Sequence, residues 1–269
     1  MKKITISAVI VAKNEEDKIK NCLESIKWVD EIIFIDNEST DKTAEIAKKY
    51  TSKFYIRNGG KYDASLHNKN FGFTKASGEW ILSVDADEVL TDSCKQEILR
   101  KIKENQYDSF YFNFKPFFFG KEFVGPLWTK TKIIRLFKKN KGVYSSLDSH
   151  TPLDVQGKIG RIHSPIYHYG YPDIETFIRK MNLYTTWSAN LSNDGQKSGL
   201  LAKNIGRINF YYLFIEPALF LPHYFIFRKN YKDGIYGLVL SVLVTFYLFV
   251  ERAKLWKLQN DKRSNEKRV

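Results

Sequence analysis

The chain has 269 residues, of which 43% are apolar and 27% charged, which is typical of globular proteins and excludes disorder or low complexity over the whole chain. Lysine and arginine (43) outnumber aspartate and glutamate (30), and the net charge of +13 favours anionic partners such as phosphates, nucleic acids or an anionic membrane surface. Two cysteines, Cys22 and Cys94, exclude a disulfide framework or a multi-cysteine zinc site and indicate a reducing compartment.

The first hundred residues alternate between strand-like and helix-like segments. Residues 4–12 form a charge-free run typical of a strand buried on both faces, and acidic residues follow too soon for a signal peptide. We expect Asn14 to cap the helix that follows. Further strands are predicted at 31–36, 54–57 and 79–84, and further helices from a cap at Ser39 or Thr40 to about 50, at 65–76, and from a cap at Thr91 to about 105. This alternation predicts an α/β fold with a mostly parallel sheet and helices on both faces.

The middle of the chain predicts a mixed extension of the sheet, with short strands at 109–114 and 133–137 and a helix at 174–190. The last third is apolar. Residues 210–227 contain one formal charge, Glu216, and two prolines, and residues 235–250 are sixteen uncharged residues, fewer than the roughly 20 that a membrane span needs. Basic residues flank both stretches, so we expect a helical extension that associates with a membrane surface. Buried core helices with a solvated basic tail are the alternative.

Three predicted strands end in polar clusters: Lys13-Asn14-Glu15, Asp36-Asn37-Glu38 and Asp85-Ala86-Asp87. Because parallel α/β sheets bind ligands at the carboxyl ends of their strands, we expect these clusters to meet in one crevice.

The carboxylates in these clusters suggest particular ligands. Asp85 and Asp87 can share Mg²⁺ or Mn²⁺ with a substrate diphosphate, and Asp36 can accept an N–H from a nucleobase. The alternatives are a solvated loop and a turn residue. No glycine-rich phosphate loop follows the first strand, so basic residues and a metal must meet the phosphate charge. Arg135 is the anion-binding candidate, because an arginine on an apolar strand needs a partner.

The blocks 8–15, 36–43 and 78–88, in this order and spacing, resemble glycosyltransferase family 2, whose fold is GT-A. The likeness is greatest to the lipopolysaccharide inner-core β-glucosyltransferase branch, and it includes residues 128–137 and 233–238. It covers most of the chain. It implies a Rossmann-like, mostly parallel sheet flanked by helices, with a nucleotide-sugar-binding half at 1–105, an acceptor-side half at 106–200 and an apolar, basic, membrane-associating helical extension at 201–269.

The resemblance also implies an activity. It is the inverting transfer of a hexose, glucose in the first place, from a UDP-sugar to a lipid-anchored or lipopolysaccharide-core saccharide, assisted by Mg²⁺ or Mn²⁺ at the cytoplasmic face of the inner membrane. The site residues that it implies are Ala12, Asn14 and Glu15 around the nucleotide, Asp36 at the uracil, Asp85 near the ribose and metal, and Asp87 on the metal.

In this family a carboxylate takes the proton from the attacking acceptor hydroxyl. Many relatives carry His-Glu after the Arg-Leu-Phe stretch, but this chain has Asp148-Ser149-His150-Thr151. Asp148 is therefore the candidate base and His150 a candidate metal ligand or diphosphate contact, with Glu88 as a rival base. A cluster of aromatic and histidine residues, Ile162-His163 and 167–171, suggests acceptor stacking or diphosphate binding, with strand packing as the alternative.

Two other classes of function remain at this stage. A nucleotidyltransferase would also use paired carboxylates, but it needs a triphosphate-binding loop that is missing after the first strand. A basic, non-enzymatic nucleic-acid-binding protein would interleave basic and aromatic residues on one face. Here the positive charge lies largely with the apolar last third, so we expect a membrane partner and no nucleic acid. The sequence sets no oligomeric state.

Overall fold

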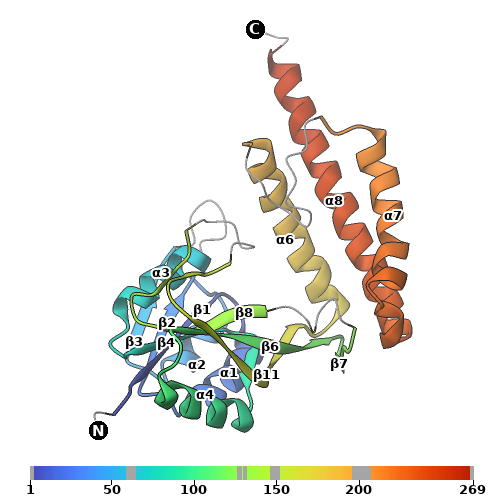
Figure 1. Cartoon of the computed structure of the whole chain (residues 1–269). Coiled ribbons are helices and arrows are strands. Elements are labelled where there is room, and N and C mark those ends of the chain that lie inside the picture. Colours follow the sequence, from blue (N-terminus) through green and yellow to red (C-terminus); the bar gives the residue numbers. More distant parts are fainter. Residues whose placement is uncertain are drawn as a thin grey trace. The chain divides into compact units, whose positions relative to one another are not determined.

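The computed structural model describes residues 3–58, 65–125, 129, 132–145, 152–195 and 207–266. The chain forms two compact units (Figure 1). Unit 1 comprises Met1–Phe117 and Lys130–Gly170 and contains the sheet. Unit 2 comprises Phe118–Thr129 and Tyr171–Val269 and is mainly helical.

The sheet of unit 1 begins with four parallel strands in the order β3-β2-β1-β4, as the alternation of strands and helices predicts. It continues through β8, β6, β11 and β5, where β4 pairs antiparallel with β8, β8 with β6, and β11 with β5. The strands are β1 (Ile6–Ala12), β2 (Glu31–Asp36), β3 (Lys53–Ile56), β4 (Trp80–Asp85), β5 (Glu88–Leu90), β6 (Ser109–Phe118), β7 (Lys121–Glu122), β8 (Lys132–Lys138), β9 (Gly142–Val143), β10 (Asp154–Val155) and β11 (Ile159–Tyr171). β7 pairs with β6, and β9 with β10.

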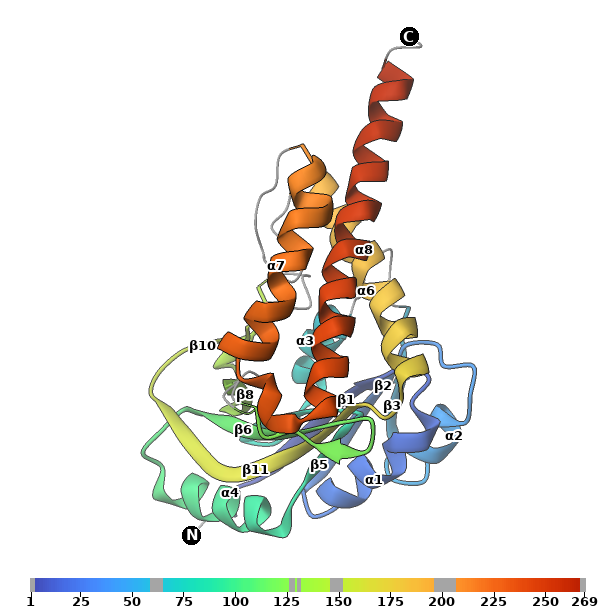
Figure 2. The same ribbon diagram turned by 90° about the vertical axis from the view of Figure 1, so that its right-hand side faces the viewer.

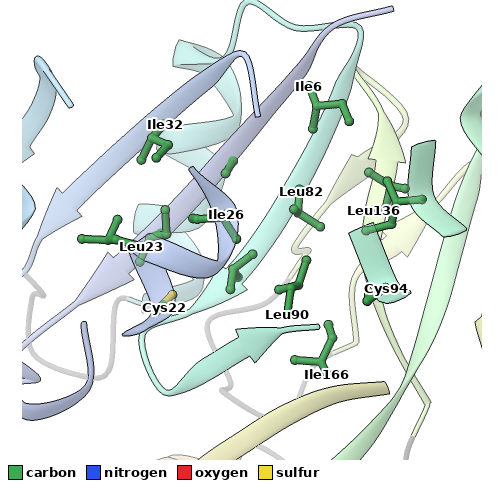
Figure 3. Packing of buried hydrophobic residues seen from close by; sticks show 14 of the residues in the cluster. Ile6, Cys22, Leu23, Ile26, Ile32, Leu82, Leu90, Cys94, Leu136 and Ile166 are labelled. Atoms are coloured by element: carbon green, nitrogen blue, oxygen red, sulfur yellow. The ribbon is translucent and has the colours of Figure 1, made fainter. Parts of the chain in front are cut away.

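Helices cover both faces of the parallel strands. They are α1 (Glu16–Ile26), α2 (Thr43–Ala47), α3 (Ser65–Lys75) and α4 (Asp92–Glu104). Alternate residues of β1 belong to different cores: Ala8 and Ile10 pack with α1 and α4, whereas Val9 and Val11 pack with α3. Figure 3 shows residues of the first of these cores, among them Cys22 and Leu23 of α1 and Leu82 of β4. Burial on both faces explains the charge-free strand sequences.

The helix caps agree with the sequence only in part. Thr91 caps α4 as predicted, because its side chain accepts a hydrogen bond from the Cys94 N–H at 3.1 Å. The predicted Asn14 cap is wrong: Asn14 has φ +54°, α1 starts at Glu16, and the Asn14 side chain bonds elsewhere. α2 likewise starts at Thr43 rather than after Ser39 or Thr40, and it ends at Ala47.

Unit 2 is built around its last helix. It contains α6 (Ile174–Asn193), π-helical turns η1 (Tyr211–Ile215) and η2 (His223–Phe227) on either side of α7 (Glu216–Pro222), a 3₁₀ turn η3 (Asn230–Asp233) and α8 (Ile235–Glu266). α6 and α7 both pack on α8, which lies between them in both views (Figures 1 and 2).

The run 233–238, which the sequence analysis singled out, closes the turn before α8. The buried Asp233 carboxylate accepts hydrogen bonds from the Val124 N–H at 2.8 Å and the Gly125 N–H at 3.0 Å, which fastens the segment after β7 to this turn. Gly237 is needed because a Cβ there would lie 1.9 Å from the Asn230 carbonyl oxygen. The motif is therefore a structural clamp within unit 2.

α8 continues well beyond Val250, where the apolar run in the sequence ends. Arg252 is buried there, donating from Nε to Glu216 of α7 at 3.1 Å and from Nη1 to Glu251 at 2.9 Å. Because each of these charged side chains is paired, they can be buried where α8 packs on α7. Within the described residues, Ile235–Lys262 is long and apolar enough to cross a membrane by length and composition, although 39% of its most apolar window is buried inside the protein.

Candidate functional site

The loops after β1 and β2 are joined at the carboxyl edge of the sheet. The Asn14 N–H donates to Ser39 Oγ at 3.0 Å, and Asn14 Oδ1 accepts from the Thr40 N–H at 2.8 Å. The Glu15 N–H donates to Thr43 Oγ1 at 2.8 Å. The left-handed backbone of Asn14 turns its amide toward the second loop, so residues 12–15 lie directly beside the residues that follow β2.

Asp36 and Asp85 end the two strands that flank β1. Ala12 pairs with Asp36 and Val11 with Asp85, so the register places both carboxylates at the same edge of the sheet. Asp36 is buried, and its Oδ2 accepts a hydrogen bond from the Ser39 N–H at 3.0 Å. Its Oδ1 has no hydrogen-bond partner among the residues that the structure describes. A buried carboxylate oxygen without a donor is costly, which fits a ligand N–H at this position.

Two cations hold the Asp85 carboxylate. Lys69 Nζ of α3 lies 2.5 Å from Oδ1, and Arg135 Nη2 of β8 bonds Oδ2. Burial alone would raise the pKa of Asp85, but Arg135 and Lys69 outweigh that effect and hold the pKa far below its usual range. The Arg135 pKa is raised in turn, because Asp85 and Glu88 outweigh the effect of its own burial. Asp85 is therefore a carboxylate at any physiological pH.

Glu88 is the most enclosed acid of the site, with 1% of its surface exposed. Its Oε1 lies 2.5 Å from Arg135 Nη2, and its Oε2 accepts a hydrogen bond from the Asp85 N–H at 3.0 Å. Burial raises the pKa of Glu88 to about 7, with Arg135 opposing the shift and Asp85 adding to it. The sequence predicted that Arg135 binds an anion, and its partners in the structure are these two carboxylates.

Asp87 lies next to His168 of β11, with 3.6 Å between Oδ1 and Nε2. The pairing of β11 with β5 brings them together: His168 is in register with Glu88, and the Tyr169 N–H donates to the Asp87 carbonyl oxygen at 2.8 Å. The His168 ring also contacts Phe114, over which Arg135 lies. His168, from the predicted aromatic and histidine cluster, thus lies beside Asp87. Tyr169 of the same cluster stacks on Phe117, with 4.7 Å between ring centroids.

Asp87 and His168 fit one side of a divalent metal shell. A carboxylate oxygen and an imidazole nitrogen suit Mn²⁺, and Mg²⁺ is usually bound by one or two carboxylates with substrate phosphates completing its shell. Within the described ranges, no group of three or more His, Cys, Asp or Glu side chains is arranged to hold a metal ion. An ion here would therefore depend on oxygens from the substrate or from water. Asp148 and His150 lie outside the described residues.

Comparison with known proteins identifies the family. The model of glycosyl transferase family 2 matches residues 7–169, which is more than half of the chain and includes every site residue described above. The chain belongs to this family. It is a glycosyltransferase with a GT-A fold, a mostly parallel sheet flanked by helices, and an apolar C-terminal helix. The resemblance noted in the sequence is confirmed.

Relatives match this family 2 glycosyltransferase along nearly its whole length. An uncharacterized glycosyltransferase of Rickettsia typhi is 30% identical over 271 residues, covering 96% of this chain and 88% of that protein. The lipopolysaccharide core biosynthesis glycosyltransferase LpsC of Rhizobium meliloti is 24% identical over 264 residues, covering 95% and 93%. Among solved structures, S. aureus TarS 1–349 in complex with UDP-GlcNAc aligns with a TM-score of 0.48 and 15% identity, covering 97% of this chain and 92% of that one.

Sequence reasoning missed two residues of this site in the glycosyltransferase. Lys69 lies on α3 and is buried against Asp85, and a lysine inside a helix gave no signal beyond its charge. His168 was noticed within an aromatic cluster, but its position beside Asp87 depends on the pairing of β11 with β5, which joins segments almost 80 residues apart. Of the two basic residues that contact Asp85, the sequence therefore singled out Arg135 and overlooked Lys69.

Proposed function

We propose that the protein is an inverting hexosyltransferase that moves glucose, or a related hexose, from a UDP-sugar to a lipid-anchored or lipopolysaccharide-core saccharide. The single observation that carries the proposal is the common edge of the sheet: Asp36 and Asp85 end the two strands that flank β1, Asp87 follows two residues after Asp85, and Asp36 Oδ1 has no hydrogen-bond partner among the described residues. One edge thus offers an acceptor for a base N–H and charged groups for a diphosphate.

The donor side uses residues from β1, β2, β4, α3 and β8. Asp36 Oδ1 would accept the imide N–H of uracil, and residues 12–15 would line the nucleotide. Lys69 and Arg135 hold Asp85 ionised and fixed, so that it can face the ribose and the ion. Because Asp85 and Glu88 already pair with these two cations, the charge of the diphosphate would be met mainly by the divalent ion.

Asp87 and His168 are the residues that would hold a divalent ion. Such an ion would neutralise the diphosphate as it leaves the sugar. Asp87 would contribute the carboxylate, and His168 is fixed by its contact with Phe114. His150, the ligand suggested by the sequence, stays a prediction.

The acceptor hydroxyl must lose a proton as it attacks the anomeric carbon. Glu88 is enclosed and engaged by Arg135 and by the Asp85 N–H, so we assign it a positioning role through Arg135. The base role then falls to Asp148, which remains a sequence-based candidate.

The acceptor class and the cellular place rest on two supports. LpsC, which matches along nearly the whole chain, is named for lipopolysaccharide core biosynthesis. The net charge of +13 and the apolar α8 favour the anionic, cytoplasmic face of the inner membrane, where a lipid-anchored saccharide is accessible.

The test measures UDP release from a panel of UDP-sugars with Mg²⁺ or Mn²⁺, and NMR assigns the anomer of the product. We expect one donor to be preferred and the anomeric configuration to invert. Asp87→Asn should lower turnover by about 10²–10³-fold, as expected when a group that stabilises transition-state charge is removed. The matched control Asp154→Asn changes an exposed aspartate of β10 and should leave turnover unchanged. Full activity of Asp87→Asn, or retention of configuration, would overturn the proposal.

A further inference from the structure

One face of α8 carries a continuous apolar stripe that the protein itself does not bury. Ile235, Leu238, Val242, Phe246 and Trp256 are all exposed. Their successive spacings of three, four, four and ten residues place them on one side of the helix, because ten residues make about three turns. Side chains of this kind normally lie in a core, so an exposed row along several helical turns indicates an interaction surface.

The stripe continues onto the helix that precedes α8 in the chain. Phe210 contacts Phe214 at 5.0 Å between ring centroids, Phe214 contacts Phe249 at 6.1 Å, and Phe249 contacts Phe246 at 6.2 Å. Further exposed apolar residues of this segment are Tyr211, Ile215, Leu219, Ile226 and Phe227. Residues 208–227 contain one formal charge, Glu216, which is buried against Arg252. We call this combined surface the apolar face of unit 2.

α6 packs on the other side of α8. Leu240 and Val244 share a core with Phe177 and Met181 of α6. These two residues of α8 each lie two positions beyond Leu238 and Val242, which is about 200° around the helix. Figure 2 shows α6 and α7 on different sides of α8. On α6 the exposed apolar residues Ile174, Ile178 and Leu183 alternate with exposed polar and charged residues, whereas the apolar face, on a different side of α8, has only one formal charge over residues 208–227.

The outer surface of α6 argues against a span by α8. Glu175, Arg179 and Asn182 of α6 are exposed beside the residues that pack on the apolar part of α8. If that part of α8 crossed a bilayer, these polar and charged groups would have to enter the hydrocarbon with it, which is strongly unfavourable. A helix pair that lies flat keeps α6 in water.

The charges around the apolar face indicate which surface it meets. Exposed basic residues stand at both ends of the hairpin: Arg207, Arg228, Lys229, Lys232 and Lys257. Basic side chains that border an apolar surface favour anionic lipid headgroups with acyl chains beneath them. A second copy of this chain would bring like charges together at the same places.

We propose that unit 2 is a monotopic membrane anchor that lies in the plane of an anionic bilayer, with its apolar face in the acyl boundary and α6 toward water. This inference deepens the membrane location proposed above, and it does not depend on which sugar is transferred.

The first experiment measures co-sedimentation of the full chain with vesicles of phosphatidylcholine, with and without 30 mol% phosphatidylglycerol, a share of about one lipid in three chosen to mimic an anionic leaflet. Val242→Glu and Leu183→Glu form a matched pair, because Val242 is 48% exposed on α8 and Leu183 is 45% exposed on α6. Both variants add one negative charge. We expect wild type to prefer anionic vesicles, Val242→Glu to bind about tenfold more weakly, and Leu183→Glu to bind within about twofold of wild type. Phe246→Glu is the second variant of the apolar face. Equal loss in the matched pair, or no binding by wild type, would overturn the proposal.

The second experiment distinguishes a flat anchor from a span. An environment-sensitive probe is attached at Val242→Cys or at Arg179→Cys, and brominated lipids measure its depth. Labelled wild type gives the background, since Cys22 and Cys94 are buried. A shallow quenching profile at 242 with none at 179 supports the flat anchor. Quenching at the bilayer centre, or quenching at both positions, contradicts it, as does a dimer in solution that Val242→Glu converts to a monomer without any binding to vesicles.

UDP release in detergent solution separates this proposal from the one on sugar transfer. If the wild-type protein turns over a UDP-sugar but does not bind vesicles, the membrane anchor is contradicted and the proposed transfer is not. Vesicle binding without turnover of any UDP-sugar leaves the anchor standing and contradicts the proposed transfer. Val242→Glu should keep its turnover in solution while losing vesicle binding, which would support both.

Discussion

The two units use buried charges in different ways. In unit 1, Asp85, Glu88 and Arg135 meet at the carboxyl edge of the sheet, the edge at which Asp36 also ends its strand. In unit 2, Arg252 joins Glu216 of α7 to α8 in the middle of a helical pair. A buried ion pair by itself is thus no indication of a site. What distinguishes unit 1 is that its charges lie where several strands end, together with a buried acid, Asp36, one of whose oxygens has no hydrogen-bond partner in the described part of the chain.

The largest expected effect is that of Arg135→Met. The change leaves buried Glu88 without its cation, while Asp85, whose side chain is 35% exposed, keeps Lys69; we expect about 3–5 kcal/mol lower stability from Glu88 together with loss of UDP release. Thermal and urea unfolding measure the first, and turnover per folded molecule the second. Arg161→Met is the matched control, because Arg161 is an exposed arginine of the same sheet and should have little effect. Normal turnover by a folded Arg135→Met protein would show that the buried charges of unit 1, like those of unit 2, serve stability alone.

Arg252→Met tests whether the buried charges of unit 2 affect stability without affecting turnover. It leaves Glu216 and Glu251 buried without their cation, so a loss of about 3–5 kcal/mol in stability is again expected. At a temperature where the variant is folded, however, UDP release per folded molecule should match that of wild type. If turnover falls while circular dichroism shows an intact fold, buried charge in unit 2 takes part in catalysis, and the distinction is wrong.

The smallest effect on UDP release is expected from a change of Glu31, at the amino edge of the same sheet. Glu31 of β2 accepts hydrogen bonds from Lys53, Ser7 and Ser77. Burial alone would raise the pKa of Glu31, but these hydrogen bonds outweigh it and lower the pKa from 4.5 to about 2. Because the folded-state pKa is the lower one, the stabilisation is complete above pH 4.5 and is lost as the pH falls toward 2. Unfolding measured between pH 5 and 2 should show a flatter dependence in Glu31→Gln, with UDP release at neutral pH unchanged. An unchanged slope would show that Glu31 does not titrate in this range.

Local sequence signals predicted the first half of the fold well. β2 has the predicted bounds, because an apolar run that ends in an acid marks a buried strand closely. The Thr91 cap was also predictable from local chemistry. Asn14 failed as a cap because its side chain serves a long-range partner, the Thr40 N–H, and no local rule reports that competition.

The site was predictable wherever its residues end strands. Asp36 and Asp85 could be placed at one edge because each follows a run of uncharged residues that ends a parallel strand, and Asp87 comes two residues after Asp85. Lys69 and His168 could not be placed, because their contacts depend on the packing of α3 and on the pairing of a strand that comes late in the chain. The uncharged run 235–250 gave no signal that Glu251 and Arg252 pair with each other and, through Arg252, with Glu216 of α7.

The chain passes between its two units at residues 117–118, 129–130 and 170–171, since the short segment Phe118–Thr129 belongs with the helices. Phe118 and Phe123 of that insert pack with Phe177 and Leu240, and Asp233 fastens its backbone. A truncation after Gly170 would therefore strip the insert of its packing and leave two phenylalanines in solvent. A water-soluble form for crystallisation is better sought by replacing exposed residues such as Val242 than by cutting the helices away.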